Sequence, residues 1–338
     1  MSALVGLLAL AQAPTPRRPL DVARVLAMRY PAAHTMSYIP ALSWAGAMRL
    51  SALTGDPQFA VKARTDMAPF LSGTTPTIAE PYLLTSLAGH LAFAELAAKD
   101  NDSAALELAR KGADFIMPND AAKETVRFPR QWTDDMFMAS AVWSRVGAQT
   151  KDDRYGAAVG RLLTSYSEKL QRPDGLFIHA VEGPHAWGRG NGFAALGLAD
   201  ALALLPASWP HRANALEIYR RHMNALRKHQ AEDGMWRQVV DEPTSYREFT
   251  VTAMTIAAMS RGVRLGWLER SFVSAIDRAW EALSTRIGAD GSVADVCSGT
   301  AAGATKDYYL NRPAVSGGDD RGGAMALLAS IEIEELRR

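Results

Sequence analysis

The sequence predicts an all-α protein of one domain, arranged as a closed ring of six helical hairpins. Apolar residues recur at three- and four-residue spacing from about Leu20 to the C-terminus, strand-like alternation is scarce, and one turn motif returns at a nearly constant interval. The 338 residues contain no Pro- or Ser-rich linker. We therefore expect an N-terminal extension at 1–20 and a single domain at 21–338.

The helices expected along the chain share a high content of Ala and Leu and an apolar stripe at helical spacing. They include residues 41–53, 104–115, 137–146, 155–170, 194–205, 213–229, 251–260 and 272–285. The segments 137–146 and 194–205 carry little charge on any face, which is typical of helices enclosed by other helices.

The turn motif is an Asp-Gly pair followed by apolar residues at Asp174, Asp233 and Asp290, with intervals of 59 and 57 residues. This period fits two helices with their connections. Polar turns at 53–59 and 149–155 enter new helices at the other ends of the hairpins, and about six such units fill the chain. A closed ring leaves one central cavity and needs no polar capping repeats, so the rarity of charge on alternate helices favours a ring over an open solenoid.

The composition excludes several classes of partner. The net charge of +1 gives no global field for nucleic acid or an anionic membrane, and no stretch reaches the ~20 apolar residues of a membrane span. The single cysteine, Cys297, forms no internal disulfide and is expected to be a small buried residue. The histidines lack the spacing of a zinc site, so we expect no metal. We also expect no other cofactor, and a protein that is a monomer or a weak homodimer.

The N-terminus permits two locations. The apolar run at 3–9 and the segment Ala-Gln-Ala at 11–13 resemble the end of a signal peptide, which predicts a periplasmic or secreted protein. No Lys or Arg precedes the run, and Pro14 follows the small residues, which favours a cytoplasmic protein.

The most informative segment, 187–193, reads Trp-Gly-Arg-Gly-Asn-Gly-Phe and opens an apolar helix. Glycine lets the backbone approach a ligand and adopt positive φ, Arg189 offers a planar fork to a carboxylate, and Trp187 and Phe193 can lie against a sugar ring. The segment therefore predicts a sugar-acid site, with a glycine-rich helix start as the structural alternative. Dinucleotide binding is disfavoured because the glycine spacing is wrong and no buried strand precedes it.

Two adjacent acids, Asp134 and Asp135, begin an apolar helix in the segment Arg-Gln-Trp-Thr-Asp-Asp-Met-Phe-Met at 130–138. A helix cap accounts for one of them. The second acid and the flanking aromatic and Met residues indicate the wall of a site, where apolar surroundings raise the pKa of a carboxyl and keep it protonated as a general acid.

Five motifs follow one another in a fixed order. They are Trp-x-Asp-x-Met-Phe-Met at 132–138, Gly-Leu-Phe-x-His at 175–179, the segment 187–193, His-Gln with Asp-Gly-Met-Trp at 229–236, and Cys-Ser-Gly-Thr at 297–300 with Arg312-Pro313. Together, over about residues 30–330, they resemble glycoside hydrolase families 88 and 105, the unsaturated uronyl hydrolases. The resemblance implies an (α/α)6 toroid that removes a 4,5-unsaturated uronic acid from the non-reducing end of lyase-generated oligosaccharides.

The implied mechanism hydrates the C4=C5 double bond: an aspartic acid protonates C4, water adds at C5, and the resulting hemiketal opens and releases the aglycone. Asp134 occupies the position of the family's acid/base. The residues expected to bind substrate are Arg189 at the uronate carboxylate or a hydroxyl, Trp187 and Phe193 as walls, His179, Tyr38 and Asp135. A core aromatic residue remains the alternative for Tyr38, and a structural histidine the alternative for His179.

The sequence departs from the family pattern at three places. No acid lies in 81–89, where members carry a second aspartate, and Glu80 is the nearest. The segment between His179 and Trp187 is short. The C-terminal Asn-Asp-x-His-Gly pattern reads Gly-Asp-Asp-Arg-Gly at 318–322, where Asp319 is expected to brace the site.

Two other functions remain open. A sugar 2-epimerase would use paired histidines in the cavity, for which only His179 and His185 are candidates. A carbohydrate-binding toroid without catalysis would bind substrate without turnover. The sequence does not distinguish rhamnogalacturonan, ulvan and glycosaminoglycan as the parent polysaccharide.

Overall fold

The computed structural model describes residues 17–338, so the apolar run at 3–9 and the Ala-Gln-Ala segment lie outside the described residues. Helix α1 (Pro19–Arg29) begins two residues inside the predicted extension. Among the described helices, none combines the length and apolar character needed to cross a bilayer.

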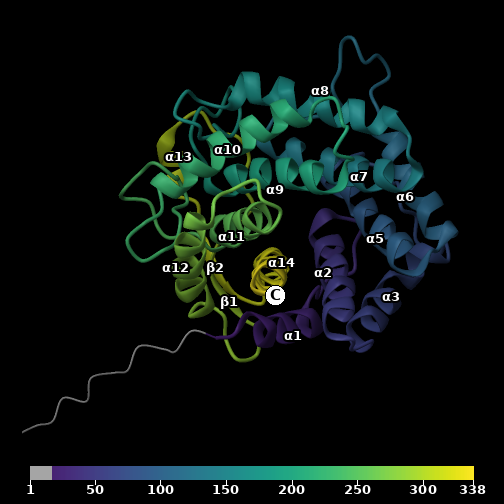
Figure 1. The fold of residues 1–338 in the computed structure, drawn as a ribbon, viewed down its shortest axis with the longest axis horizontal. Coiled ribbons are helices and arrows are strands. Elements are labelled where there is room, and N and C mark those ends of the chain that lie inside the picture. Colours follow the sequence, from purple (N-terminus) through teal and green to yellow (C-terminus); the bar gives the residue numbers. More distant parts are fainter. Residues whose placement is uncertain (1–16) are drawn as a thin grey trace, which may run out of the picture.

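Six inner helices form a ring in residues 17–338, each packed against the next, and α14 closes back onto α2 (Figure 1). They are α2 (Tyr38–Thr54), α5 (Leu91–Asp100), α7 (Thr133–Thr150), α9 (Gly188–Leu204), α11 (Phe249–Arg264) and α14 (Asp320–Arg337). The (α/α)6 toroid predicted from the sequence is confirmed.

Six outer helices surround this ring (Figure 1). They are α1, α3 (Gln58–Leu71), α6 (Ser103–Phe115), α8 (Asp153–Leu170), α10 (Arg212–Lys228) and α12 (Val273–Ser284). Each packs mainly on one inner helix, and α1 packs chiefly on α14, so the first and last described helices close the ring together. Inner helices such as α9 and α11 are buried on nearly every face, whereas α8 and α12 expose one polar face, as their apolar stripes require.

The three Asp-Gly turns confirm the predicted repeat, because they follow the outer helices α8, α10 and α12. Gly175, Gly234 and Gly291 adopt φ of 94°, 93° and 82°, the left-handed region that favours glycine. In each turn the preceding Asp side chain accepts a hydrogen bond from the backbone N–H two residues on, at 3.0–3.2 Å.

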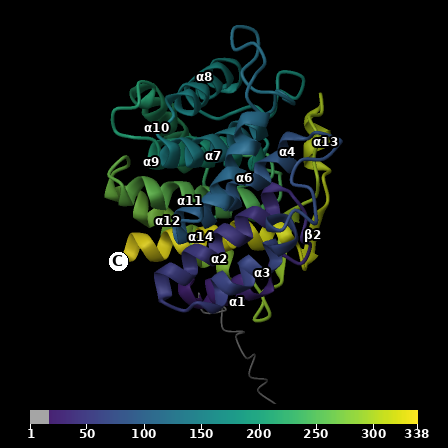
Figure 2. The same cartoon turned by 90° about the vertical axis from the view of Figure 1, so that its right-hand side faces the viewer.

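Short elements cover the end of the ring opposite the C-terminus. Strands β1 (Val293–Cys297) and β2 (Ala314–Gly317) pair antiparallel, with helix α13 (Lys306–Leu310) between them in sequence. Helix α4 (Leu84–Leu87) and the 3-10 turn η1 (Ala88–His90) precede α5. Figure 2 shows α4, α13 and β2 together at this end. The 3-10 turn η2 (Arg270–Phe272) lies in the connection from α11 to α12, at the opposite end of the ring.

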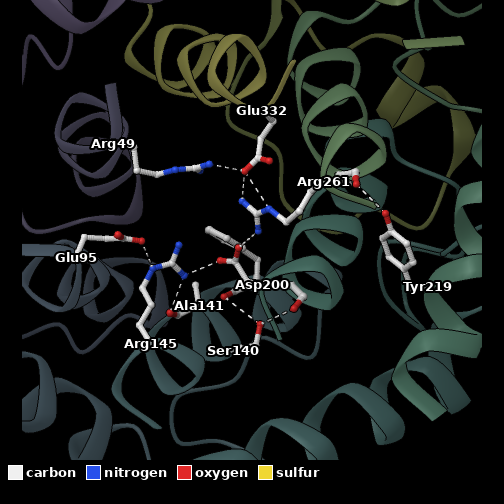
Figure 3. A network of polar contacts seen from close by, with 12 residues as sticks. Arg49, Glu95, Ser140, Ala141, Arg145, Asp200, Tyr219, Arg261 and Glu332 are labelled. Atoms are coloured by element: carbon white, nitrogen blue, oxygen red, sulfur yellow. Dashed lines mark hydrogen bonds and ion pairs between the residues drawn. The ribbon is translucent and has the colours of Figure 1, made fainter. Parts of the chain in front are cut away.

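At the other end, each inner helix contributes one charged side chain to a buried network (Figure 3). The charge alternates from helix to helix: Arg49, Glu95, Arg145, Asp200, Arg261 and Glu332. We call these six residues the charge ring. A cavity of only about 10 Å³ is left beside it, so the side chains close the centre of the toroid at this end.

The links of the charge ring are short. Arg145 donates to Glu95 at 2.7 Å and to Asp200 at 2.6 Å. Arg261 donates to Asp200 and, at 2.9 Å, to Glu332, which also accepts a hydrogen bond from Arg49 at 2.8 Å. Burial alone would raise the pKa of Glu332, but the surrounding guanidinium groups hold it well below its usual range.

Candidate active site

The predicted site residues meet where the inner helices begin. Tyr38 is the first residue of α2, Asp134 lies in the first turn of α7, Trp187 immediately precedes α9, and Arg189 lies in the first turn of α9. His179 comes from the connection between α8 and α9, where its carbonyl accepts a hydrogen bond from the backbone N–H of Thr133 at 2.9 Å.

Asp134 and His179 face each other. Asp134 Oδ2 lies 3.3 Å from His179 Nε2, outside hydrogen-bond geometry, and neither buried atom has a hydrogen-bond partner among residues 17–338. Trp132, not Asp134, occupies the N-cap of α7, and no side chain caps that helix. Asp134 is therefore not the N-cap of α7, although it lies in the first turn, where a negative charge stabilises the helix, and its Oδ2 makes no hydrogen bond within residues 17–338.

The far side of the His179 ring is fixed by Tyr309 of α13. The Tyr309 hydroxyl lies 2.9 Å from Nδ1 and accepts a hydrogen bond from the Gly303 N–H at 3.1 Å. Because the Tyr309 proton then has Nδ1 as its acceptor, this arrangement favours the tautomer that carries hydrogen on Nε2, facing Asp134. The ring also packs between Trp132 and Trp187, with centroid distances of 5.0 and 4.3 Å.

Asp135 faces the protein interior. Its Oδ2 accepts hydrogen bonds from the backbone N–H groups of Arg130 and Gln131 at 2.9 and 2.7 Å and from the Tyr166 hydroxyl at 2.7 Å. Burial raises the pKa of Asp135 to about 7. The hydrogen bond from Tyr166 opposes this rise, and the nearby Asp134 charge adds to it. This geometry favours a positioning role, in which Asp135 holds the loop before α7, over the predicted contact with substrate.

Arg189 is buried and braces the end of β1. Its Nη1 and Nη2 donate to the carbonyls of Cys297 and Ser298 at 2.7 and 2.8 Å, and its guanidinium lies 4.6 Å from the Trp187 ring centroid. The Cys297 N–H in turn donates to Glu248, the N-cap of α11, at 2.9 Å. Cys297 is buried, as the sequence predicted.

Tyr38 and Phe193 are buried edge-to-face neighbours with ring centroids 5.5 Å apart. Burial raises the pKa of Tyr38 to about 12, while the nearby Arg189 opposes that rise. The Tyr38 hydroxyl makes no hydrogen bond within the described part of the chain. Phe137 of α7 stacks on the other side of Phe193 at 5.9 Å.

With this geometry established, the comparisons with known proteins are specific. The family described as Glycosyl Hydrolase Family 88 matches residues 18–337. The chain belongs to glycosyl hydrolase family 88.

Among its relatives is the unsaturated rhamnogalacturonyl hydrolase YesR of Bacillus subtilis, 29% identical over 55% of this chain and 55% of the relative. Another is an unsaturated 3S-rhamnoglycuronyl hydrolase of an Alteromonas species, 26% identical over 48% and 42%. These matches span about half the length of the curated relatives.

Solved structures show the same fold over nearly the whole chain. A possible family 105 member from Klebsiella pneumoniae has a TM-score of 0.82 at 18% identity and covers 100% of this chain and 99% of its own. An unsaturated glucuronyl hydrolase from Bacillus sp. GL1 has a TM-score of 0.68 at 16% identity, with 94% and 95% covered.

The glycines of this family 88 motif serve helix packing. Gly188, Gly190 and Gly192 are helical and none has positive φ. A Cβ on Gly190 would lie 2.5 Å from Thr133 Oγ1 and 3.1 Å from the Trp187 ring. The interpretation that these glycines admit a ligand to a backbone of positive φ is therefore wrong, because a neighbouring helix takes the space.

Asn191 is a structural residue that the sequence did not reveal. Its Oδ1 accepts a hydrogen bond from the Phe177 N–H, and its Nδ2 donates to the Phe177 carbonyl, both at 2.9 Å. This pair ties the connection that carries His179 to α9.

The structure places the three segments at which the sequence is expected to depart from the family pattern. Residues 81–89 supply no acid, and Glu80 is exposed. Asp319 is the N-cap of α14 and accepts a hydrogen bond from the Gly322 N–H at 2.9 Å, while Arg321 Nη2 lies 3.4 Å from its Oδ2. Within residues 17–338, no cluster of His, Cys, Asp or Glu could hold a metal ion.

Proposed function

We propose that this protein removes a 4,5-unsaturated uronic acid from the non-reducing end of lyase-generated oligosaccharides by hydration of the C4=C5 double bond. The observation that carries the proposal is the pair formed by Asp134 Oδ2 and His179 Nε2, two buried polar atoms 3.3 Å apart without hydrogen-bond partners in the described chain. The family, together with relatives that are an unsaturated rhamnogalacturonyl hydrolase and an unsaturated 3S-rhamnoglycuronyl hydrolase, supports a hydrolase acting on unsaturated uronic acid oligosaccharides.

The proposed reaction begins with protonated Asp134, which transfers its proton to C4. Positive charge develops at C5 and on the ring oxygen, and water adds to C5 while its proton returns to the Asp134 carboxylate. The C5 hemiketal then opens by cleavage of its bond to the ring oxygen, and C1, now a hemiacetal, expels the aglycone as an alcohol. All atoms balance with one water consumed.

His179 and the indole rings are proposed to orient this chemistry. His179 Nε2 lies 3.3 Å from Asp134 Oδ2, so a small rotation of either side chain would let its hydrogen bond to and stabilise the ionised carboxylate after proton transfer. Trp132 and Trp187 pack against the imidazole, and Tyr309 favours the tautomer with hydrogen on Nε2. Catalysis of this type contributes about 10²–10⁴-fold to a rate.

The test uses the ultraviolet absorbance of the conjugated double bond. Purified protein is incubated with unsaturated disaccharides from rhamnogalacturonan, ulvan and glycosaminoglycan, beside Asp134→Asn and the control Asp153→Asn, which alters an exposed acid in the first turn of α8. We expect decay with wild type and the control, and a loss of at least about 100-fold in Asp134→Asn. Full activity in Asp134→Asn would exclude Asp134 as the acid.

A second candidate, a carbohydrate-binding toroid without catalysis, is favoured by the absence of an acid in 81–89. It predicts that folded wild type binds these disaccharides and leaves their absorbance unchanged. An epimerase is less well supported, because His185 Nε2 is engaged with the Ala304 carbonyl at 3.2 Å and does not pair with His179.

A further inference from the structure

Three arginine side chains surround the turn at 298–299, directly after β1. Arg189 donates to two carbonyls at the start of this turn, at 2.7 and 2.8 Å. Arg312 donates to the Ser298 hydroxyl at 3.2 Å and to the next carbonyl. Arg321 extends from α14 toward the other side chains of this group. Its Nη1 is next to Gly299, because it would lie 3.9 Å from a Cβ added to that glycine.

The three arginines differ in how many of their N–H groups already donate hydrogen bonds within the protein. Arg189 is only 2% exposed, and each of its terminal nitrogens holds a carbonyl. Arg312 uses Nη2 on the turn and lies over the Tyr308 ring at 5.4 Å. The Arg321 side chain is 22% exposed, and its one polar contact in the described chain is with Asp319 Oδ2 at 3.4 Å, a long distance for a hydrogen bond.

Arg321 lies close to the proposed reaction centre. It is in the first turn of α14, which packs against α2, and Tyr38 is the first residue of α2. Burial is the main cause that raises the pKa of Tyr38. The charge of Asp134 adds to this rise, whereas the charges of Arg189 and Arg321 oppose it. Tyr38 therefore lies within electrostatic reach of both Asp134 and the Arg321 guanidinium.

We propose that Arg321 binds the carboxylate of the unsaturated uronic acid, while Arg189 braces the turn against which Arg321 lies. The assignment rests on the proposed function, because the bound group is the C6 carboxylate of that substrate. A guanidinium fork with uncommitted donors matches a carboxylate, and the carboxylate is attached to C5, next to the carbon that is protonated. Holding it would fix C4 relative to Asp134.

Asp319 is a like charge that such a carboxylate would meet beside Arg321. Its Oδ1 is committed to the Gly322 N–H at 2.9 Å, and its Oδ2 faces Arg321 Nη2. Asp319 therefore orients one nitrogen of the fork and leaves Nη1, on the side of the 298–299 turn, for the substrate.

The test compares an unsaturated uronyl disaccharide with its C6 methyl ester, which keeps the double bond and its absorbance but removes the charge. Wild type is expected to prefer the acid. Arg321→Gln should raise KM for the acid by about 10- to 100-fold with a smaller change in kcat, and should abolish the preference for acid over ester. Arg321→Lys, which keeps the charge but not the fork, should retain part of the preference.

Arg312→Gln is the matched control, because it removes an arginine from the same turn. It should retain the preference for the acid even if its overall rate falls. A wild-type acid-to-ester ratio in Arg321→Gln overturns the assignment. Loss of the preference in Arg312→Gln also overturns it. Circular dichroism checks that each variant is folded.

Failure of the proposed function gives a different result. If wild type leaves the absorbance of every substrate unchanged, the hydrolase proposal fails, and the ratio of acid to ester is then measured from dissociation constants by tryptophan fluorescence. A preference for the acid that Arg321→Gln abolishes supports the carboxylate site in a binding protein. A preference that persists in this variant overturns it.

Discussion

Asp135→Asn is expected to change how the stability of the protein depends on pH. The Asp135 side chain is buried, and its pKa is raised to about 7, compared with about 3.9 in an unfolded chain. Between these values the folded state binds the proton more tightly than the unfolded state. The free energy of unfolding of the wild type therefore falls as pH rises through this window, by up to about 4 kcal/mol in total.

The variant removes this dependence because Asn does not ionise, and its side-chain oxygen can still accept hydrogen bonds from two of the three donors. Urea unfolding followed by circular dichroism at pH 5, 6, 7 and 8 gives the difference in free energy between variant and wild type. About 3 kcal/mol of the change should accumulate from pH 5 to pH 8, in favour of the variant. The exposed-acid control Asp153→Asn should show no such trend. A difference that is constant across this range, or that moves in favour of the wild type, would refute the reasoning.

Three further changes test the packing and the site. Glu332→Gln leaves buried arginines without their shared anion, so the free energy of unfolding should fall by about 3–5 kcal/mol in urea titrations; a loss below about 1 kcal/mol would contradict the charge ring. Gly197→Ala puts a Cβ too close to a carbonyl of α7 and should lower the free energy of unfolding by about 3 kcal/mol. Gly55→Ala, at φ 74° in open space, should lower it by about 1 kcal/mol. Equal losses in the two variants would contradict the close contact at Gly197. Tyr309→Phe removes the donor to His179 and should lower kcat about 10-fold in the absorbance assay with an altered pH profile, and unchanged kinetics would contradict the tautomer.

The ring was predictable because its signals are local and repeated. The Asp-Gly turns recur after successive outer helices, and each needs only a glycine of positive φ and an Asp side chain to be recognised. The ends of helices are predicted less accurately. The helix expected to begin at Phe137 begins at Thr133. The apolar stripe does not extend over its first turn, because Asp134 and Asp135 are polar.

The partners of the site residues were not predictable from one sequence. His179 and Tyr309 are 130 positions apart, and nothing around Tyr309 marks it as a histidine partner. Tyr166 is 31 positions from the Asp135 carboxylate that it contacts. The misinterpreted glycines, such as Gly190, show the same limit, since a local pattern reveals that space is needed but not whether a ligand or a helix fills it.

The charge ring has a consequence for how a polymer can be processed. Because these side chains block the far end of the toroid, a polysaccharide cannot thread through it, and a proposed substrate must enter and leave by the same opening. Under the proposed function, the enzyme could not slide along a chain and would act distributively. Removal of the unsaturated residue would leave a terminus without the double bond, so each chain would give a single turnover. The protein would therefore release one monosaccharide for each chain end that a lyase has made.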